Sequence, residues 1–164
     1  MTDTTTNASA KHEELRTEIE QARKGFHDLL QSLSEEDFRK KSGNDAWSNG
    51  QLMWHMGRGV AYIPELVERS RNGKNLNLPR GVFDFINPWL TRWGSRGAKL
   101  NTVGQFYDEA TEKALAVLGT VNDDEWDKTA VITGNEWSVE HHFRIPGEHF
   151  AEHKADILKS LGRS

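Results

Sequence analysis

Apolar side chains recur at alternating steps of three and four along most of the chain, the spacing that places them on one face of an α-helix. The first such stretch covers residues 15–33 and amounts to an amphipathic helix of about five turns. Further stretches follow at residues 48–71 and 102–118, and another begins at residue 138. No convincing stretch alternates apolar and polar positions between turn residues, as a half-buried strand would. The pattern predicts an all-α protein.

Short hydroxyl side chains mark where two of these helices begin. Ser48, in WSNGQ, is followed three residues later by Gln51, the spacing of a capping box that satisfies free backbone N–H groups. Ser138, in WSVE, is the corresponding cap of the last helix. Pro64 lies inside the second helix and removes one backbone hydrogen bond, which predicts a kink near residues 59–62 in preference to a break.

Two segments of the sequence match each other and indicate an internal repeat. LQSLSEEDFRK at 30–40 and LGTVNDDEWDK at 118–128 each end a helix and open an acidic turn that closes with an aromatic residue. Each is followed by a Trp-Ser pair just before a new helix, so the chain is interpreted as two related helical hairpins. The alternative is that any helix-turn-helix collects leucine, acidic residues and a cap.

The two hairpins are separated by residues 72–100, a connection long enough to run the length of a helix bundle. The second and third helices can therefore be parallel and joined by a long crossover. Trp89 and Trp93 lie in this crossover, where we expect them outside the regular helices. Three roles compete for these two rings: they line a pocket, they form a dimer contact, or they only hold the connection against the helices.

Composition limits the classes of protein to be considered. A length of 164 residues favours one domain, predicted over residues 11–164. MTDTTTNASA, at residues 1–10, lacks the order of a secretory signal and predicts a disordered tail. No run approaches the roughly 18 apolar residues that span a bilayer, and the chain has no cysteine for disulfides, thiolate catalysis or thiolate metal ligation. We expect a soluble, cytoplasmic protein with no membrane contact.

Charge is distributed unevenly along the chain. The net charge of -4 does not favour a nucleic-acid binder that relies on phosphate contacts. Residues 71–100 nevertheless hold six cationic side chains and one aspartate, a formal charge of +5, which leaves -9 for the remainder. The crossover is therefore a basic segment in an acidic protein.

The stretch GEHFAEH at residues 147–153 places His149 and His153 four residues apart, so that one helix face presents both imidazoles to one ion. A third ligand must come from another helix, and His55 lies on an apolar stripe where a polar ring needs a partner. Three neutral imidazoles leave a divalent ion open positions, as in catalytic sites, and suit zinc or nickel. The alternative is that His55 is a core histidine whose hydrogen bonds are satisfied and that His149 and His153 belong to a solvated helix face.

Other histidines are weaker candidates. His142 is seven residues before His149 and therefore on nearly the same face, but Pro146 lies between them and predicts a kink. His142 is accordingly a reserve ligand. His12 and His27 have polar neighbours on the first helix, and we expect both to be exposed to solvent.

WSNGQLMWH, with one inward histidine early in a helix, and HFAEHKADI near the end resemble the DinB-like superfamily of bacterial four-helix bundles, which includes the YfiT-type metal-dependent proteins. The resemblance covers nearly the whole chain after the tail. It implies an up-down-down-up four-helix bundle with a long crossover between helices 2 and 3. It also implies that His55, His149 and His153 bind a divalent metal at one end of the bundle.

The superfamily includes thiol transferases that use bacillithiol or mycothiol, isomerases and hydrolases. The resemblance therefore implies a metal-dependent enzyme that transfers a low-molecular-weight thiol to an electrophilic small-molecule substrate. The thiol would come from the cofactor, since the chain has no cysteine. A hydrolase or isomerase on the same site and a non-catalytic metal-binding bundle are the alternatives, and a homodimer is a further hypothesis.

Arg80, Arg92 and Arg96 are the candidates for binding an anionic substrate or the thiol cofactor. Each lies next to a glycine or an aromatic residue in the crossover, and an arginine can hold a carboxylate through two parallel hydrogen bonds. The alternative is that these cations only solubilise a surface connection or pair with the acidic helices, since exposed ion pairs contribute little.

Overall fold

The computed structural model describes residues 3–44 and 46–163, with side chains from Ala10 onward. Most of the described residues are helical, which agrees with the predicted all-α class. The helices are α1 (Asp3–Gln31), α2 (Glu35–Arg39), α3 (Asn49–Ala61), α4 (Ile63–Arg71), α5 (Arg80–Gly94), α6 (Val103–Leu118) and α7 (Val139–Ser160). Two strands, β1 (Thr129–Ile132) and β2 (Asn135–Ser138), and short 3₁₀ turns at Ser95–Gly97 and Asp123–Glu125 complete the fold.

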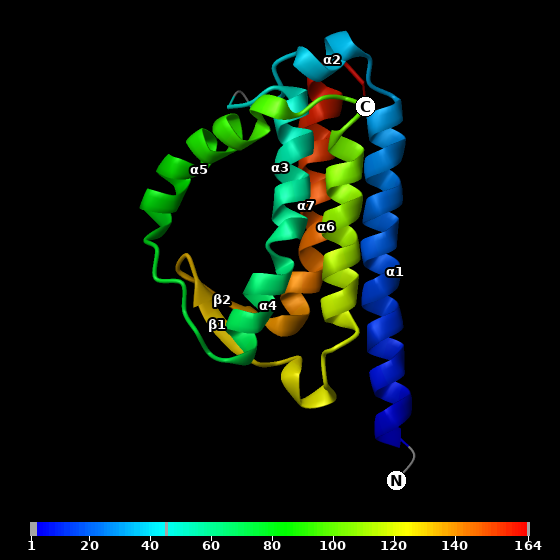
Figure 1. The fold of residues 1–164 in the computed structure, drawn as a ribbon, viewed down its shortest axis with the longest axis vertical. Helices are drawn as coiled ribbons and strands as arrows, with labels where there is room; N and C mark the ends of the chain where they lie inside the picture. The colour runs from blue at the N-terminus through cyan, green and yellow to red at the C-terminus, as the bar shows by residue number, and fades with distance from the viewer. Residues whose placement is uncertain (1–2, 45, 164) are drawn as a thin grey trace.

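Four long helices, α1, α3, α6 and α7, lie side by side along the long axis of the molecule (Figure 1). Helices α1 and α7 run toward the end that α2 covers, whereas α3 and α6 run away from it (Figure 1). Helix α3 packs against both α6 and α7, and α1 packs against the same two helices. The apolar face of each helix is buried in a shared core that includes Leu15, Phe26, Leu52, Tyr107, Phe143 and Ile157.

The predicted caps are present at both helix starts. The hydroxyl of Ser48 accepts a hydrogen bond from the N–H of Gln51 (3.2 Å), and the side chain of Gln51 accepts one from the N–H of Ser48 (3.0 Å). Ser138 accepts a hydrogen bond from the N–H of His141 (3.1 Å) and begins α7. These bonds fix the first turns of α3 and α7, the two helices that carry the candidate ligands.

The internal repeat extends to the hydrogen bonds that precede α3 and α7. In each half a capping box opens the acidic turn. The carbonyl of Lys40 then accepts a hydrogen bond from the N–H of Asn49 (2.9 Å), and the carbonyl of Lys128 accepts one from the N–H of Val139 (3.0 Å). The same local geometry therefore introduces two helices that pack against each other.

The second predicted helix is broken and not merely kinked. Helix α3 ends at Ala61, Tyr62 forms its cap, and α4 begins at Ile63 with Pro64 in its first turn. Proline has no N–H to donate, so the carbonyls at the end of α3 are closed by the N–H of Tyr62 instead. The break lies within the predicted region.

The expectation of no strands was wrong. Strands β1 and β2 form an antiparallel hairpin whose turn residues, Thr133 and Gly134, both have positive φ (50° and 87°), as a type I′ turn requires. Leu76 joins the hairpin: its N–H donates to the carbonyl of Val131 (2.8 Å), and its carbonyl accepts from the N–H of Thr133 (3.2 Å). Four-residue strands are too short for their alternation to be distinguished in the sequence.

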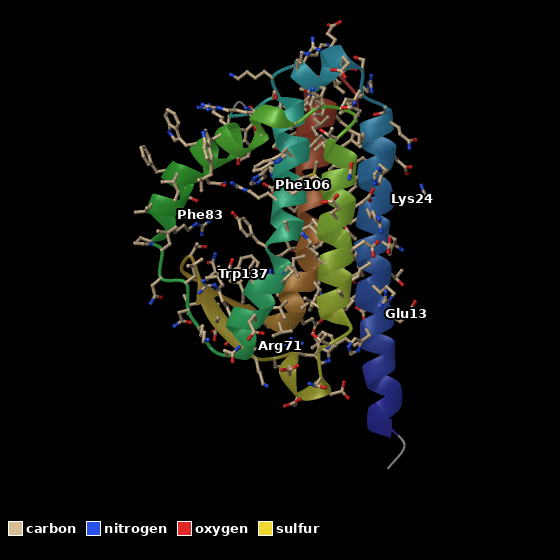
Figure 2. All side chains as sticks on the ribbon, in the orientation of Figure 1. Glu13, Lys24, Arg71, Phe83, Phe106 and Trp137 are labelled. Atoms are coloured by element: carbon tan, nitrogen blue, oxygen red, sulfur yellow. The ribbon has the colours of Figure 1, made fainter. Side chains whose placement is uncertain are left out.

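The crossover also differs from the expectation, because Trp89 and Trp93 lie inside a regular helix, α5. The helix forms despite Pro88, and its side chains along the outer edge project away from the long helices (Figure 2). Apolar residues at helical spacing within 80–94 explain why this segment is helical. Helix α5 lies beside α3 and packs against it.

At the N-terminus, α1 begins at Asp3. The backbone of residues 3–10 therefore continues the helix where the sequence predicted a disordered tail, because the hydrogen-bond ladder of α1 extends beyond its apolar face. Residues 1–2 lie outside the described part of the chain.

Candidate metal centre

Three histidines from two helices meet at one point between α3 and α7. His55 comes from α3, and His149 and His153 come from α7. Each offers a ring nitrogen, and these nitrogens all lie within 4.8 Å of one another. The ring centroids are 4.7 Å apart for His55 and His149, 5.3 Å for His55 and His153, and 4.6 Å for the pair on α7. The structure thus brings together the three residues that the sequence indicated.

The local sequence explains how His149 reaches this position. Helix α7 is continuous from Val139 to Ser160, so Pro146 does not disturb the spacing of the two histidines that follow it. On α3, Gly59 lies against the ring of His149: a Cβ at Gly59 would stand 2.7 Å from Nδ1 of that ring. The absence of a side chain at Gly59 therefore makes room for the imidazole.

Two of the rings have a polar partner on the Nδ1 side. Nδ1 of His153, which is buried, lies 3.3 Å from the carboxylate of Asp156. Nδ1 of His55 lies 3.3 Å from the hydroxyl of Thr91, a fully buried residue of α5. When Nδ1 of His153 carries the proton and donates it to Asp156, Nε2 of that ring keeps its lone pair. Nδ1 of His55 also faces the guanidinium of Arg58, which can only donate, so Nδ1 of His55 is an acceptor in that contact. Such outer partners orient histidines that bind metals.

The surroundings keep two of the imidazoles neutral. Burial lowers the pKa of His55 to about 2, with further lowering from His149 and from Arg58. Burial likewise lowers the pKa of His149 to about 3, with contributions from His153 and Arg58. Neutral imidazole is the form that coordinates a metal ion.

The donor set fits a divalent ion. Zinc–nitrogen bonds of about 2.0–2.1 Å in a tetrahedral site place two nitrogens about 3.3 Å apart. The nitrogens of the cluster lie within 4.8 Å of one another, so ligation requires them to approach by at most about 1.5 Å. Three imidazoles leave at least one position open, and zinc or nickel accepts such ligands.

Arg58 is a residue of this site that the sequence analysis missed. It follows His55 by one helical turn, and its Nη2 lies 3.3 Å from Nδ1 of His55 and donates a hydrogen bond to the side-chain oxygen of Asn87. The guanidinium stands over the rings of Trp54 (5.5 Å) and Tyr62 (5.9 Å). The i, i+3 spacing from His55 was the available signal.

The three predicted arginines lie elsewhere. Arg80 is exposed and faces Asp84 on the same helix (3.9 Å). Arg92 donates to the carbonyl of Ala46 (3.0 Å) and, with Arg96, lines an open groove on α5. The groove is otherwise apolar, formed by Ile86, Trp89, Leu90 and Trp93. Among the described contacts, none joins these arginines to the histidine cluster.

The remaining histidines have other partners. His142 is buried, and its Nε2 lies 2.9 Å from the hydroxyl of Ser70, so the reserve ligand is not part of the cluster. The expectation that His12 and His27 are solvent-exposed was wrong. Both are half-buried: His27 pairs with Asp108 (2.8 Å), and His12 bonds a backbone carbonyl (3.0 Å). Their polar neighbours in sequence did not reveal these contacts with distant segments.

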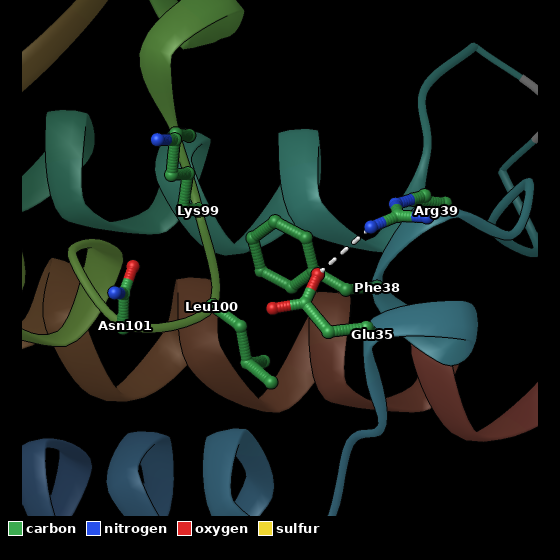
Figure 3. Close-up of a pocket in the computed structure, with 7 residues that line it drawn as sticks. Glu35, Phe38, Arg39, Lys99, Leu100 and Asn101 are labelled. Carbon is green, nitrogen blue, oxygen red and sulfur yellow. Dashed lines mark hydrogen bonds and ion pairs between the residues drawn. The ribbon is translucent and has the colours of Figure 1, made fainter.

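A separate hollow lies at the end that α2 covers, between α2 and the segment before α6 (Figure 3). Its wall includes the ion pair of Glu35 and Arg39 (3.3 Å), with Phe38 and Leu100 contributing apolar surface. It shares no residue with the histidine cluster. The histidine cluster is therefore the stronger candidate site.

Comparisons with known proteins concern the family and the fold of the chain. The sequence pattern of the DinB superfamily matches residues 18–157, a range that includes all three histidines. No curated protein matches the chain. A solved structure of a mutant mycothiol-dependent maleylpyruvate isomerase is similar over 89% of this chain, with a TM-score of 0.70 and 12% sequence identity. The match covers 60% of that protein's chain, and at this identity it shows a shared fold. No described helix is long and apolar enough to cross a membrane.

Proposed function

The chain belongs to the DinB superfamily, and we propose that it is a divalent-metal-dependent enzyme that uses a low-molecular-weight thiol on an electrophilic small-molecule substrate. The observation that carries the proposal is the convergence of His55, His149 and His153, all within 4.8 Å through their ring nitrogens. The similar fold of a mycothiol-dependent isomerase supports the choice of a thiol. Thiol transfer is the proposed reaction, and isomerisation or hydrolysis at the same cluster is the second candidate.

A divalent ion bound at the cluster supplies Lewis-acid chemistry, because coordination lowers the pKa of a thiol or of water. The chain contributes no thiol, since it has no cysteine, so the nucleophile of a thiol reaction must come from a small molecule. Asp156 faces Nδ1 of His153, which leaves Nε2 of that ring free, and Thr91 contacts Nδ1 of His55. Trp47 packs on His55, with ring centroids 4.6 Å apart, and keeps water from that face.

The proposal includes an up-down-down-up four-helix bundle of α1, α3, α6 and α7, with α5 in a long crossover. Helix α5 contributes directly to the site, since its Thr91 faces His55 and its Asn87 bonds Arg58. The crossover is accordingly one wall of the metal end and a determinant of the substrate.

Arg80, Arg92 and Arg96 remain proposed contacts for the thiol cofactor. The groove on α5 supports this role for Arg92 and Arg96, which line it, better than for Arg80, which faces Asp84. The cytoplasmic location also stays a prediction.

A homodimer through α5 is part of the proposal. Phe85, Trp89 and Trp93 are 74%, 65% and 70% exposed and repeat every four residues, so they form one apolar row on the helix. Rows of this kind on a soluble domain are typical of contact surfaces.

Metal analysis tests the proposal first. Protein purified without added metal should hold about one divalent ion per chain, and alanine at His55, His149 or His153 should remove it. His141→Ala is the matched control, since His141 lies on α7 outside the cluster. Loaded protein is then assayed with a panel of small thiols and electrophiles and, separately, with hydrolysable esters and amides. Full metal content in a His149→Ala, His153→Ala double variant would end the proposal.

A further inference from the structure

Arg58 is half-buried, and no carboxylate of the described residues pairs with it. None of the ion pairs among the described residues involves Arg58. On the next helix, by contrast, Arg69 pairs with Glu65 at 2.7 Å. Removing a cation from water without an anion is costly, and a basic side chain kept in that state beside a candidate catalytic cluster indicates an anionic ligand.

The neighbours of Arg58 hold its guanidinium in place without neutralising it. Trp54 and Tyr62 provide aromatic faces, and Asn87 accepts a hydrogen bond from Nη2. A guanidinium has five N–H donors. In the described part of the chain, no hydrogen bond is made by Nε or Nη1 of Arg58, so the N–H groups of each of these nitrogens can donate to an anion.

The location of Arg58 ties this capacity to the histidine cluster. Its Nη2 is 3.3 Å from Nδ1 of His55, and its charge also acts on His149. A divalent ion at the cluster would add a second positive charge nearby. The acidic side chain at the cluster, Asp156, instead faces His153. A ligand that reaches both centres must therefore carry negative charge toward Arg58.

We propose that Arg58 is the anion-binding residue of the site and that the thiol or substrate held there carries a carboxylate, which Arg58 grips. This inference rests on the proposed function and narrows its ligand to a class. Arg58 lies closer to the cluster than the crossover arginines do: Arg58 contacts His55, whereas Arg92 and Arg96 line a separate groove on α5.

The test compares two thiols that differ only at the far end, 3-mercaptopropionate and 3-mercaptopropan-1-ol, by calorimetric titration of zinc-loaded protein. Wild type should prefer the carboxylate. Arg58→Gln should lose about tenfold to a hundredfold of that preference, the range for hydrogen bonds to a charged group, with zinc content and mercaptopropanol affinity unchanged. Arg58→Lys keeps the charge but not the planar guanidinium, and its preference for the carboxylate should lie between those of wild type and Arg58→Gln. Arg69→Gln is the control and should match wild type.

A preference for the carboxylate that survives in both Arg58→Gln and Arg58→Lys would overturn the inference while leaving the metal proposal intact. Loss of zinc in Arg58→Gln would also overturn it, because Arg58 would then act on the ligands. If wild type holds no zinc, the proposed function fails. In that case propionate is titrated into ¹⁵N-labelled apoprotein: movement of the Arg58 Nε–H resonance supports anion binding, and an unmoved resonance refutes it.

Discussion

Gly59 is the position at which one added methyl group tests the geometry of the histidine cluster. A Cβ at Gly59 would lie 2.7 Å from Nδ1 of His149 and 3.0 Å from Cε1 of the same ring. Both distances are shorter than the roughly 3.5–4.0 Å at which non-bonded heavy atoms are in favourable contact. Gly59→Ala must therefore displace the imidazole of His149 by about half an ångström or more.

Two opposing effects act on the folding free energy of Gly59→Ala. Alanine is favoured over glycine in a helix by about 1 kcal/mol, and this gain offsets the cost of displacing the ring when no metal is present. Metal ligation, however, tolerates errors of only about 0.2 Å. Loss of support for a ligating histidine costs about tenfold to a hundredfold in metal affinity. We expect Gly59→Ala to fold as wild type does and to bind zinc at least about tenfold more weakly.

The assay is a zinc titration against a chromophoric chelator, with melting curves in EDTA as the control for folding. Gly147→Ala is the matched variant, since it lies on α7 two residues before His149 and its added Cβ would meet open space. It should raise the melting temperature by about 2–4 °C and leave zinc affinity unchanged. Wild-type zinc affinity in Gly59→Ala would refute the packing of His149 against Gly59.

Other predictions concern stability and assembly. Zinc-loaded protein should melt at a higher temperature than protein in EDTA, because the ion binds only the folded state; coincident curves for protein shown to be loaded would contradict this. Burial lowers the pKa of His142 to about 4 from its ordinary value of about 6.5, so its contribution to stability is present above pH 6.5 and is lost as pH falls through 4. The loss amounts to about 3 kcal/mol, and urea unfolding of wild type and His142→Asn should show a weaker acid dependence in the variant. Trp89→Glu with Trp93→Glu should convert a dimer to monomers in sedimentation, whereas a wild type that sediments as a monomer would exclude the dimer.

Local signals in the sequence were sufficient for α1, α6 and α7 and for the caps that begin α3 and α7, but α5 was missed. The capping box of Ser48 and Gln51 and the cap at Ser138 depend on residues three positions apart, so the hydrogen bonds can be predicted from spacing alone. The pairing of His149 with His153 is local for the same reason, since one helical turn separates them. The short hairpin was not predicted, because a strand of four residues shows too little alternation of apolar and polar positions. Its Thr133-Gly134 turn was nevertheless a usable signal.

The tertiary structure decided which side chains meet across helices. The approach of His55 to α7, the fit of His149 against Gly59 and the contact of Thr91 with His55 all join residues more than thirty positions apart. Packing also decides the charged contacts. Among the described residues, no carboxylate pairs with Arg58, which lies where α3, α4 and α5 pack, whereas Arg80 pairs with Asp84 within its own helix. Spacing along a helix specifies a face, but the partner of that face is chosen by the packing of the whole core, which no single segment of the sequence contains.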